Sequence, residues 1–320
     1  MFNTCLPAAQ ARRHRPRALS AVLLAIGLSA ASVGLETRAA ADPLRSRLES
    51  TYAKWQSAMM SKDYRAWARS TASHRQTLTR NIIVSQRLPF PRSLFELPMR
   101  PPEIANLKFI DTRNSSDEAL AIYYGKVDYG VPLESPASEV PENLFLLYYY
   151  KEDGQWKFDS SRYLNLNTAP GIRGEIARGN RSFLDDPQFE LPPPQPPAPE
   201  ICPLPDYTAH LRVVAIGYEC AIRINQHHLS VVSQNVTIDL VIGGLMKGKN
   251  LLALETTQLE APEDPDNPGK ALARRFELSI WVRPDDPRKP PVRVYEFAPE
   301  TVPAVHQAPI WANAVTIPEG

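Results

Sequence analysis

A run of prolines near the middle of the chain limits the fold more than any other feature. Residues 191–206 read Leu-Pro-Pro-Pro-Gln-Pro-Pro-Ala-Pro-Glu-Ile-Cys-Pro-Leu-Pro-Asp. Proline fixes φ and has no amide proton, so this run is expected in extended polyproline II conformation. The residues before it mix helical and strand patterns, and the residues after it show only strand patterns. The sequence therefore predicts two folded domains joined by a proline-rich linker, residues 187–206.

The first 41 residues have the pattern of an export signal. Four arginines between positions 12 and 17 precede an apolar run at 18–35, and Ala39-Ala40-Ala41 offers a cleavage site before Asp42. An uncleaved membrane anchor is the alternative. With cleavage, we expect a periplasmic or secreted bacterial protein without a membrane span.

The net charge of the chain bears on its partners. Removing residues 1–41 takes five arginines and one glutamate from 36 basic and 35 acidic residues, which leaves a net charge of −3. The basic residues are interspersed with acidic ones, which argues against a nucleic-acid partner.

Two cysteines remain after residues 1–41 are removed, Cys202 and Cys220. In an exported chain they form either one disulfide or two buried free thiols.

Residues 42–186 show an α+β pattern. Apolar residues at helical spacing predict a helix over 44–59, Asp63 is expected to cap a second helix, and a third is expected over 73–86. Strands are expected at 107–112, 119–129, 144–151 and 156–164, with a hairpin turn at Asp153-Gly154.

The strand Leu144–Tyr150 is apolar or aromatic on both faces, so both faces of its sheet must be covered. We expect the helices on one face. The other face is expected to be covered by a partner, by the second domain, or by residues 170–190.

The first domain resembles the NTF2-like family, which includes ketosteroid-isomerase-like and SnoaL-like proteins. The resemblance covers residues 42–165. It rests on the opening helix, the Lys62-Asp63-Tyr64 break, and the hairpin Tyr148-Tyr-Tyr-Lys-Glu-Asp-Gly-Gln-Trp-Lys-Phe158. It implies a cone-shaped domain whose sheet curls around the helices and encloses a pocket that is empty, ligand-binding or catalytic. It also implies a homodimer through the sheet of the first domain. We take Trp67, Tyr124 and Tyr149 as candidate ligand-binding residues.

Catalytic members of that family use a carboxylate with a tyrosine, or a histidine with an aspartate, inside the cone. The sequence of the first domain offers one histidine, His74, on a polar helix face where it is expected at the surface. Asp63 is expected as a helix cap, and Asp128 ends an expected strand. No catalytic residue is carried over from the family, and no cofactor or metal is expected.

Residues 207–320 alternate with period two, which predicts an all-β sandwich. The expected inward residues include Leu211, Val213, Cys220, Ile222, Ile224, Val236, Ile238, Leu252, Leu254, Leu278 and Ile280. Strands at 292–297 and 315–317 are expected as well. His227 and His228 are expected at a turn or at the surface. Trp281 is expected on the outward face, either as a platform for a sugar or partner, or packed against another part of the chain.

Two segments of this second part resemble the galactose-binding-like jelly rolls found beside glycoside hydrolases. These are Ala221-Ile-Arg-Ile-Asn225 with the following His228-Leu-Ser-Val, and Gly244-Leu-Met-Lys-Gly-Lys-Asn-Leu-Leu-Ala-Leu254. In that family the second segment is structural. The resemblance therefore implies a fold and not sugar binding.

The sequence favours an exported, non-catalytic binding or scaffolding protein that recognises a small molecule, a glycan or a protein. The first alternative is an NTF2-like lyase, isomerase or hydrolase with an accessory sandwich. The second is a glycan-binding module, with Trp281 as its platform.

Overall fold

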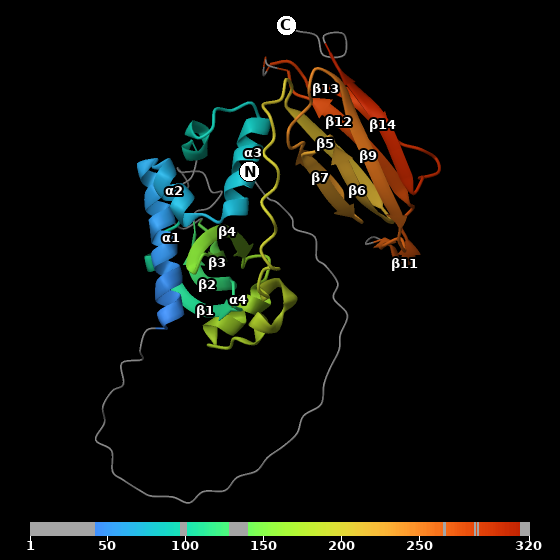
Figure 1. Ribbon diagram of the computed structural model, residues 1–320. Coiled ribbons are helices and arrows are strands. Elements are labelled where there is room, and N and C mark those ends of the chain that lie inside the picture. The colour runs from blue at the N-terminus through green and yellow to red at the C-terminus, as the bar shows by residue number, and fades with distance from the viewer. Residues whose placement is uncertain are drawn as a thin grey trace, which may run out of the picture. The chain divides into compact units, whose positions relative to one another are not determined.

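The computed structural model describes residues 42–96, 101–127, 140–264, 267–284, 286 and 288–313. The predicted export signal, Asp128 and the strand expected at 315–317 lie outside these residues. The described residues form one compact unit, in which an α+β part precedes a β-rich part (Figure 1). Among the described residues, no helix combines the length and the apolar character needed to cross a membrane.

The first three helices of the α+β part lie close to their predicted positions, and two of them begin after a capping aspartate. Helix α1 spans Pro43–Ser61, and the Asp42 carboxylate accepts a hydrogen bond from the Leu44 amide at 2.9 Å. Helix α2 spans Tyr64–Ser70 and is capped by Asp63, as predicted. Helix α3 spans Ser73–Ser85, and short 3-10 turns follow at η1 (Arg92–Phe95) and η2 (Ile104–Asn106).

A four-stranded antiparallel sheet follows the helices. Its order is β1-β2-β3-β4, with β1 at Lys108–Asn114, β2 at Glu118–Lys126, β3 at Glu142–Glu152 and β4 at Gln155–Asn165. Asp153 and Gly154 form the β3–β4 turn with φ of 50° and 75°. Positive φ at both central residues is what a tight two-residue hairpin requires, so the predicted turn is confirmed.

Both faces of this sheet are buried, as predicted. One face packs on α1 through a cluster that includes Leu48, Tyr52, Tyr123, Phe145, Leu147, Tyr149 and Phe158. The other face is covered by α4 (Pro170–Ala177), η3 (Ser182–Asp185) and η4 (Pro187–Phe189). The segment at 170–190, one of the three expected covers, lies on this face. The face expected in a homodimer is therefore occupied by the same chain.

The proline-rich segment is extended, as predicted, but it is bound along its length to the α+β part. We call residues 191–205 the strap. The Asn81 side chain of α3 donates to the carbonyl of Glu200 at 2.7 Å and accepts from the amide of Cys202 at 3.1 Å. The Tyr150 hydroxyl donates to the carbonyl of Pro193 at 3.0 Å. The linker is thus an ordered segment that lies beside α3, not a free spacer (Figure 1).

The β-rich part consists of two four-stranded antiparallel sheets. One has the order β13-β12-β5-β8 and the other β14-β9-β6-β7. The strands are β5 (Ala209–Ile216), β6 (Tyr218–Ile224), β7 (His228–Ser233), β8 (Val236–Leu240), β9 (Gly248–Gln258), β12 (Arg275–Val282), β13 (Val292–Phe297) and β14 (Val305–Ala312). A further small sheet pairs β10 (Glu263–Asp264) with β11 (Asn267–Ala271).

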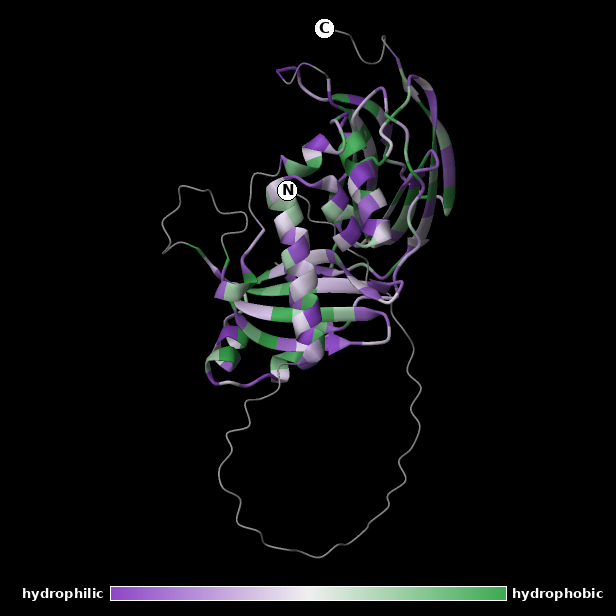
Figure 2. Ribbon diagram, turned by 60° about the vertical axis from the view of Figure 1, so that its left-hand side comes forward, coloured by the Kyte–Doolittle hydropathy of each residue, from purple (hydrophilic) through white to green (hydrophobic). Residues whose placement is uncertain are grey.

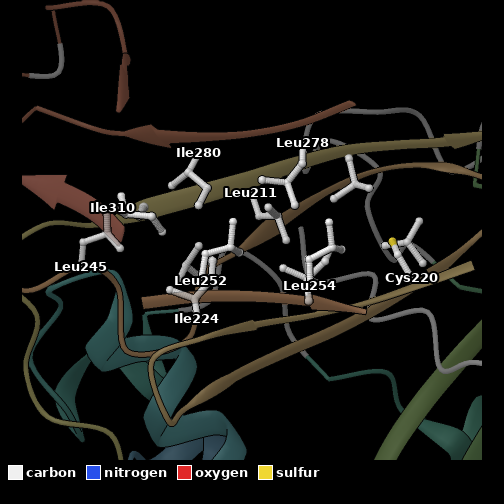
Figure 3. Close-up of a cluster of buried hydrophobic side chains, with 14 of the residues drawn as sticks. Leu211, Cys220, Ile224, Leu245, Leu252, Leu254, Leu278, Ile280 and Ile310 are labelled. Atoms are coloured by element: carbon white, nitrogen blue, oxygen red, sulfur yellow. The ribbon is translucent and has the colours of Figure 1, made fainter. Parts of the chain in front are cut away.

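The core of this part consists of the inward residues of both sheets. Leu211, Leu278 and Ile280 come from one sheet, and Ile224, Leu252, Leu254 and Ile310 come from the other (Figure 3). The period-two pattern therefore gave the correct inward set for β5, β6, β9 and β12.

The inward set predicted for β8 is wrong. Val236 and Ile238 are 50% and 68% exposed. The register pairs Thr237 with Val213 and Asp239 with Leu211, so the polar residues of β8 share the inward side. Edge strands often carry an inward charge because it discourages pairing with other chains. Alternation alone gives the period of a strand and not the face that is buried.

The turn before β9 depends on glycine and asparagine, as the jelly-roll resemblance implies. Gly244 has φ of 51°, and a Cβ there would lie 2.4 Å from the Tyr207 carbonyl oxygen. Asn250 is 1% exposed, and its side chain accepts from the Met246 amide and donates to the Met246 carbonyl, both at 2.8 Å. Glycine is needed at this turn for conformation and for close packing.

We predict that Gly244→Ala lowers the free energy of unfolding by about 2–4 kcal/mol, because backbone strain and a backbone clash add together. Urea unfolding monitored by circular dichroism measures the loss. Gly248→Ala is the control, since Gly248 has φ of 94° and open space around its Cβ position. Equal losses for the two variants would show that the clash at Gly244 contributes nothing.

Candidate functional site

A buried polar centre lies where α3 meets β4. His74 is 5% exposed, and its Nε2 lies 2.9 Å from Oδ1 of Asp159. Its Nδ1 lies 3.1 Å from the side-chain nitrogen of Gln195, which can only donate, so Nε2 carries the proton donated to Asp159. The expectation that His74 is a surface residue is wrong, because β4 and the strap cover the start of α3.

Asp159 is the charged member of this centre. The Arg75 guanidinium donates through Nε and Nη2 to its two oxygens, both at 3.0 Å, and the Ser160 hydroxyl donates at 2.6 Å. Burial favours the protonated carboxyl, but the hydrogen bonds from His74 and Arg75 outweigh it. They hold the pKa of Asp159 well below its usual value. The carboxylate is therefore fully partnered inside the chain.

The strap covers the side of His74 that faces away from Asp159, through Gln195. The Gln195 amide also bonds Glu152, whose carboxylate accepts from the Ser73 amide at 2.8 Å and the Ser73 hydroxyl at 2.9 Å. A histidine and an aspartate in contact can serve acid–base chemistry. Here both imidazole nitrogens are occupied by groups of the same chain, and the arrangement joins α3, β4 and the strap.

A second polar group lies between α1 and the sheet. The Tyr123 hydroxyl donates to Oε1 of Glu49 at 3.1 Å, and the Tyr52 hydroxyl donates to the Pro102 carbonyl at 2.9 Å. Tyr149 is fully buried, and its hydroxyl has no hydrogen-bond partner among the described residues. Burial raises the pKa of Tyr149 well above its ordinary value.

A carboxylate and a tyrosine at this distance, as in Glu49 and Tyr123, could serve acid–base chemistry. The interior beside them is filled, however, by side chains of the helix-facing core, among them Leu48, Phe145, Leu147 and Phe158. Phe145 is stacked on Tyr163, with ring centres 4.7 Å apart.

The four predicted ligand-binding residues do not form one site. Trp67 is 2% exposed and packs among the helices, and Tyr149 lies in the core between α1 and the sheet. Tyr124 lies on the opposite face of the sheet, beside α4. Trp281 is on β12 and partly buried, with Nε1 donating to the Ser279 hydroxyl at 2.9 Å and the Arg293 guanidinium 5.6 Å from its ring centre.

Cys202 and Cys220 do not form a disulfide. Both are free, buried thiols, and they lie in different surroundings. Cys202 packs on Ser85 and Asn81 of α3. Cys220 lies in the core of the sandwich (Figure 3), and burial raises its pKa to about 11.

His228 is buried rather than at the surface, which corrects the sequence-based expectation. It is 5% exposed, and its Nδ1 accepts from the Ile242 amide at 3.1 Å. Burial lowers its pKa to about 4, although Asp239 partly opposes the shift. Among the described residues, no group of three or more histidines, cysteines, aspartates or glutamates is placed to hold a metal.

The outer side of the sheet β14-β9-β6-β7 carries exposed apolar side chains, and we call it the exposed face. Its inward neighbours on β6, β9 and β14 are core residues, so the alternate residues point outward. The apolar members are 43–63% exposed: Leu229, Val231, Leu251, Val305 and Trp311. Figure 2 shows hydrophobic and hydrophilic residues interspersed along the strands of the β-rich part.

No protein-family model, no curated protein and no solved structure matches the chain. The resemblances to NTF2-like and galactose-binding-like domains therefore rest on the residues quoted for them.

The partners of His74 were missed from the sequence. Asp159 lies in an ordinary strand pattern and gives no separate signal. Gln195 does, because it is the one polar side chain between two groups of prolines. The exposed face also has a signal, because Leu251 and Leu252 are neighbours in one strand and must point to opposite faces.

We predict that Asn81→Ala releases the strap, because it removes the donor and the acceptor that hold Glu200 and Cys202. The unfolding free energy is expected to fall by about 2–4 kcal/mol, and a prolyl endopeptidase is expected to cleave the strap of the folded variant faster. Asn106→Ala is the control, since its exposed amide bonds only Glu103 among the described residues. Equal cleavage rates for the wild-type protein and Asn81→Ala would contradict the docking.

We predict an acid-dependent loss of stability from His228. Its pKa is lower in the folded than in the unfolded chain, so its neutral form stabilises the fold at neutral pH. That contribution is lost as pH falls from about 6.5 to about 4, by about 3 kcal/mol in total. His228→Asn keeps an acceptor for the Ile242 amide and does not titrate.

Urea unfolding of both proteins at about pH 7 and about pH 4 measures this contribution. The wild-type protein is expected to lose about 3 kcal/mol more than the variant. An equal loss in both would show that His228 does not titrate in this range.

Proposed function

We propose that this chain is an exported, non-catalytic binding or scaffolding protein that recognises another protein through the exposed face. The observation that carries the proposal is that five large apolar side chains, each 43–63% exposed, share one side of the β14-β9-β6-β7 sheet. Exposed apolar surface of this kind is typical of interaction sites.

The composition of the exposed face favours a protein partner over a glycan. Four of the five apolar residues are aliphatic, and one aromatic residue, Trp311, lies at the β14 edge. Charged residues alternate with them, since Arg223 pairs with Leu229 and Lys249 with Trp311 across the strands. Apolar anchors among scattered charges are usual in protein interfaces.

The polar centres of the α+β part support a non-catalytic function. The His74–Asp159 centre is sealed by the strap, and the space beside Tyr123 and Glu49 is filled by core side chains. Both features weigh against the alternative of an enzyme that uses an NTF2-like interior.

We also propose that the protein is exported, that its first part has an NTF2-like fold, and that its second part has a jelly-roll-like fold. The basic and apolar pattern of residues 1–41 supports export. A four-stranded antiparallel sheet packed on α1 supports an NTF2-like fold for the first part. The two facing antiparallel sheets and the Asn250 turn support a jelly-roll-like fold for the second part.

The test is affinity capture with the protein lacking residues 1–41, using the envelope fraction of the organism that encodes it. Quantitative mass spectrometry compares the wild-type protein with the double variant Leu251→Ser/Trp311→Ser. Loss of two apolar anchors is expected to lower retention of specific partners by about tenfold or more.

The control is Met60→Ser/Leu88→Ser, which changes two apolar residues of similar exposure outside the exposed face. Its retained proteins are expected to match those of the wild-type protein. If the Leu251→Ser/Trp311→Ser variant retained the same proteins at the same level, the exposed face would not be the recognition surface.

A further inference from the structure

A groove runs along the outer side of α1 where the helix meets the β3–β4 hairpin. It has a volume of about 450 Å³ and is open to solvent. Helix α1 contributes Ser46, Arg47, Ser50, Thr51 and Lys54, and the hairpin contributes Gly154, Gln155 and Trp156. This size is within the range of sites for small ligands.

The charged side chains that line the groove are both cationic. Neither Arg47 nor Lys54 has an ion-pair partner within the described residues. Some other arginines of the α+β part do form ion pairs, among them Arg45 with Glu49 at 2.7 Å and Arg92 with Glu96 at 2.8 Å. The lining of the groove therefore presents two positive charges that form no ion pair within the described residues, which favours an anionic ligand.

The two cations are spaced for an extended ligand with more than one charge. They are seven residues apart on one helix face, which separates their Cα atoms by about 10.5 Å along the axis. A third cation lies at the hairpin end, where the Lys151 ammonium is 5.9 Å from the ring centre of Trp156. A single small anion would contact only one of these groups.

Uncharged hydrogen-bonding groups lie between the cations. The hydroxyls of Ser46 and Ser50 and the amide of Gln155 have no partner within the described part of the chain. Trp156 is partly buried and adds an aromatic ring to the lining. Hydroxyl and amide groups around an aromatic ring suit a sugar, whose hydroxyls need such partners and whose ring has an apolar face.

We propose that this groove binds an acidic oligosaccharide, with carboxylates on separate sugar rings paired to Arg47 and Lys54 and one ring against Trp156. A uronate polymer carries a carboxylate on each ring, so one chain can reach both cations. The site lies on the α+β part and is separate from the exposed face of the sandwich. A protein with both surfaces would connect an acidic polysaccharide to a protein partner.

Isothermal titration calorimetry of the protein lacking residues 1–41 tests the proposal with trigalacturonate. The neutral trisaccharide maltotriose, inorganic phosphate and a triglutamate peptide are the comparison ligands. We expect trigalacturonate to bind at least tenfold more tightly than each of the three, with an affinity that falls as salt is added.

Arg47→Gln and Lys54→Gln are each expected to weaken trigalacturonate binding by about fivefold to tenfold. Arg65→Gln, an exposed single-charge change on α2, is the matched control and is expected to leave binding unchanged. Circular dichroism confirms that each variant is folded.

The proposal is overturned if the wild-type protein does not bind trigalacturonate, or if both groove variants bind it as the wild-type protein does. Equal or tighter binding of maltotriose, of phosphate or of triglutamate would overturn the assignment to an acidic sugar. None of these outcomes depends on the exposed face, so they leave the capture experiment unaffected.

Discussion

The hydrogen bonds between Asn81 of α3 and the strap hold the proline-rich segment against the α+β part, together with those of Arg80 and Tyr150. A proline-rich segment cannot join a sheet, so its carbonyls and few amides need side-chain partners. The Asn81 side chain is 1% exposed and supplies both an acceptor and a donor. Ser85 lies one turn further along α3, and its hydroxyl accepts a hydrogen bond from the Gly243 amide at 2.7 Å. One face of α3 thus holds both the strap and the turn of the sandwich.

Much of the fold follows from the sequence because it depends on local chemistry. Asp63 caps a helix, Asp153-Gly154 forms a hairpin, and the doubly apolar β3 required two covered faces, all as expected. What could not be derived is which segment covers which face. The phase of β8 is an example, since Val236 and Ile238 have the pattern of core residues and yet the pairing with β5 turns Asp239 inward.

The chemistry of the interior was harder to predict than the fold because it depends on residues distant in sequence. His74 looks like a surface residue until β4 brings Asp159 and the strap brings Gln195. The two proposed recognition surfaces also combine residues that are distant in the sequence. The exposed face joins four strands, and the groove joins α1 to a hairpin about 100 residues later. Neither can be assembled from the pattern of a single element.

The strap is a bound part of the fold and not a tether. Hydrogen exchange followed by nuclear magnetic resonance tests it at the Cys202 amide, which donates to Asn81, and at the Gly243 amide, which donates to Ser85. We expect both amides to exchange as slowly as the interior amides of α3. Exchange of the Cys202 amide at the rate of an unstructured peptide would contradict the account.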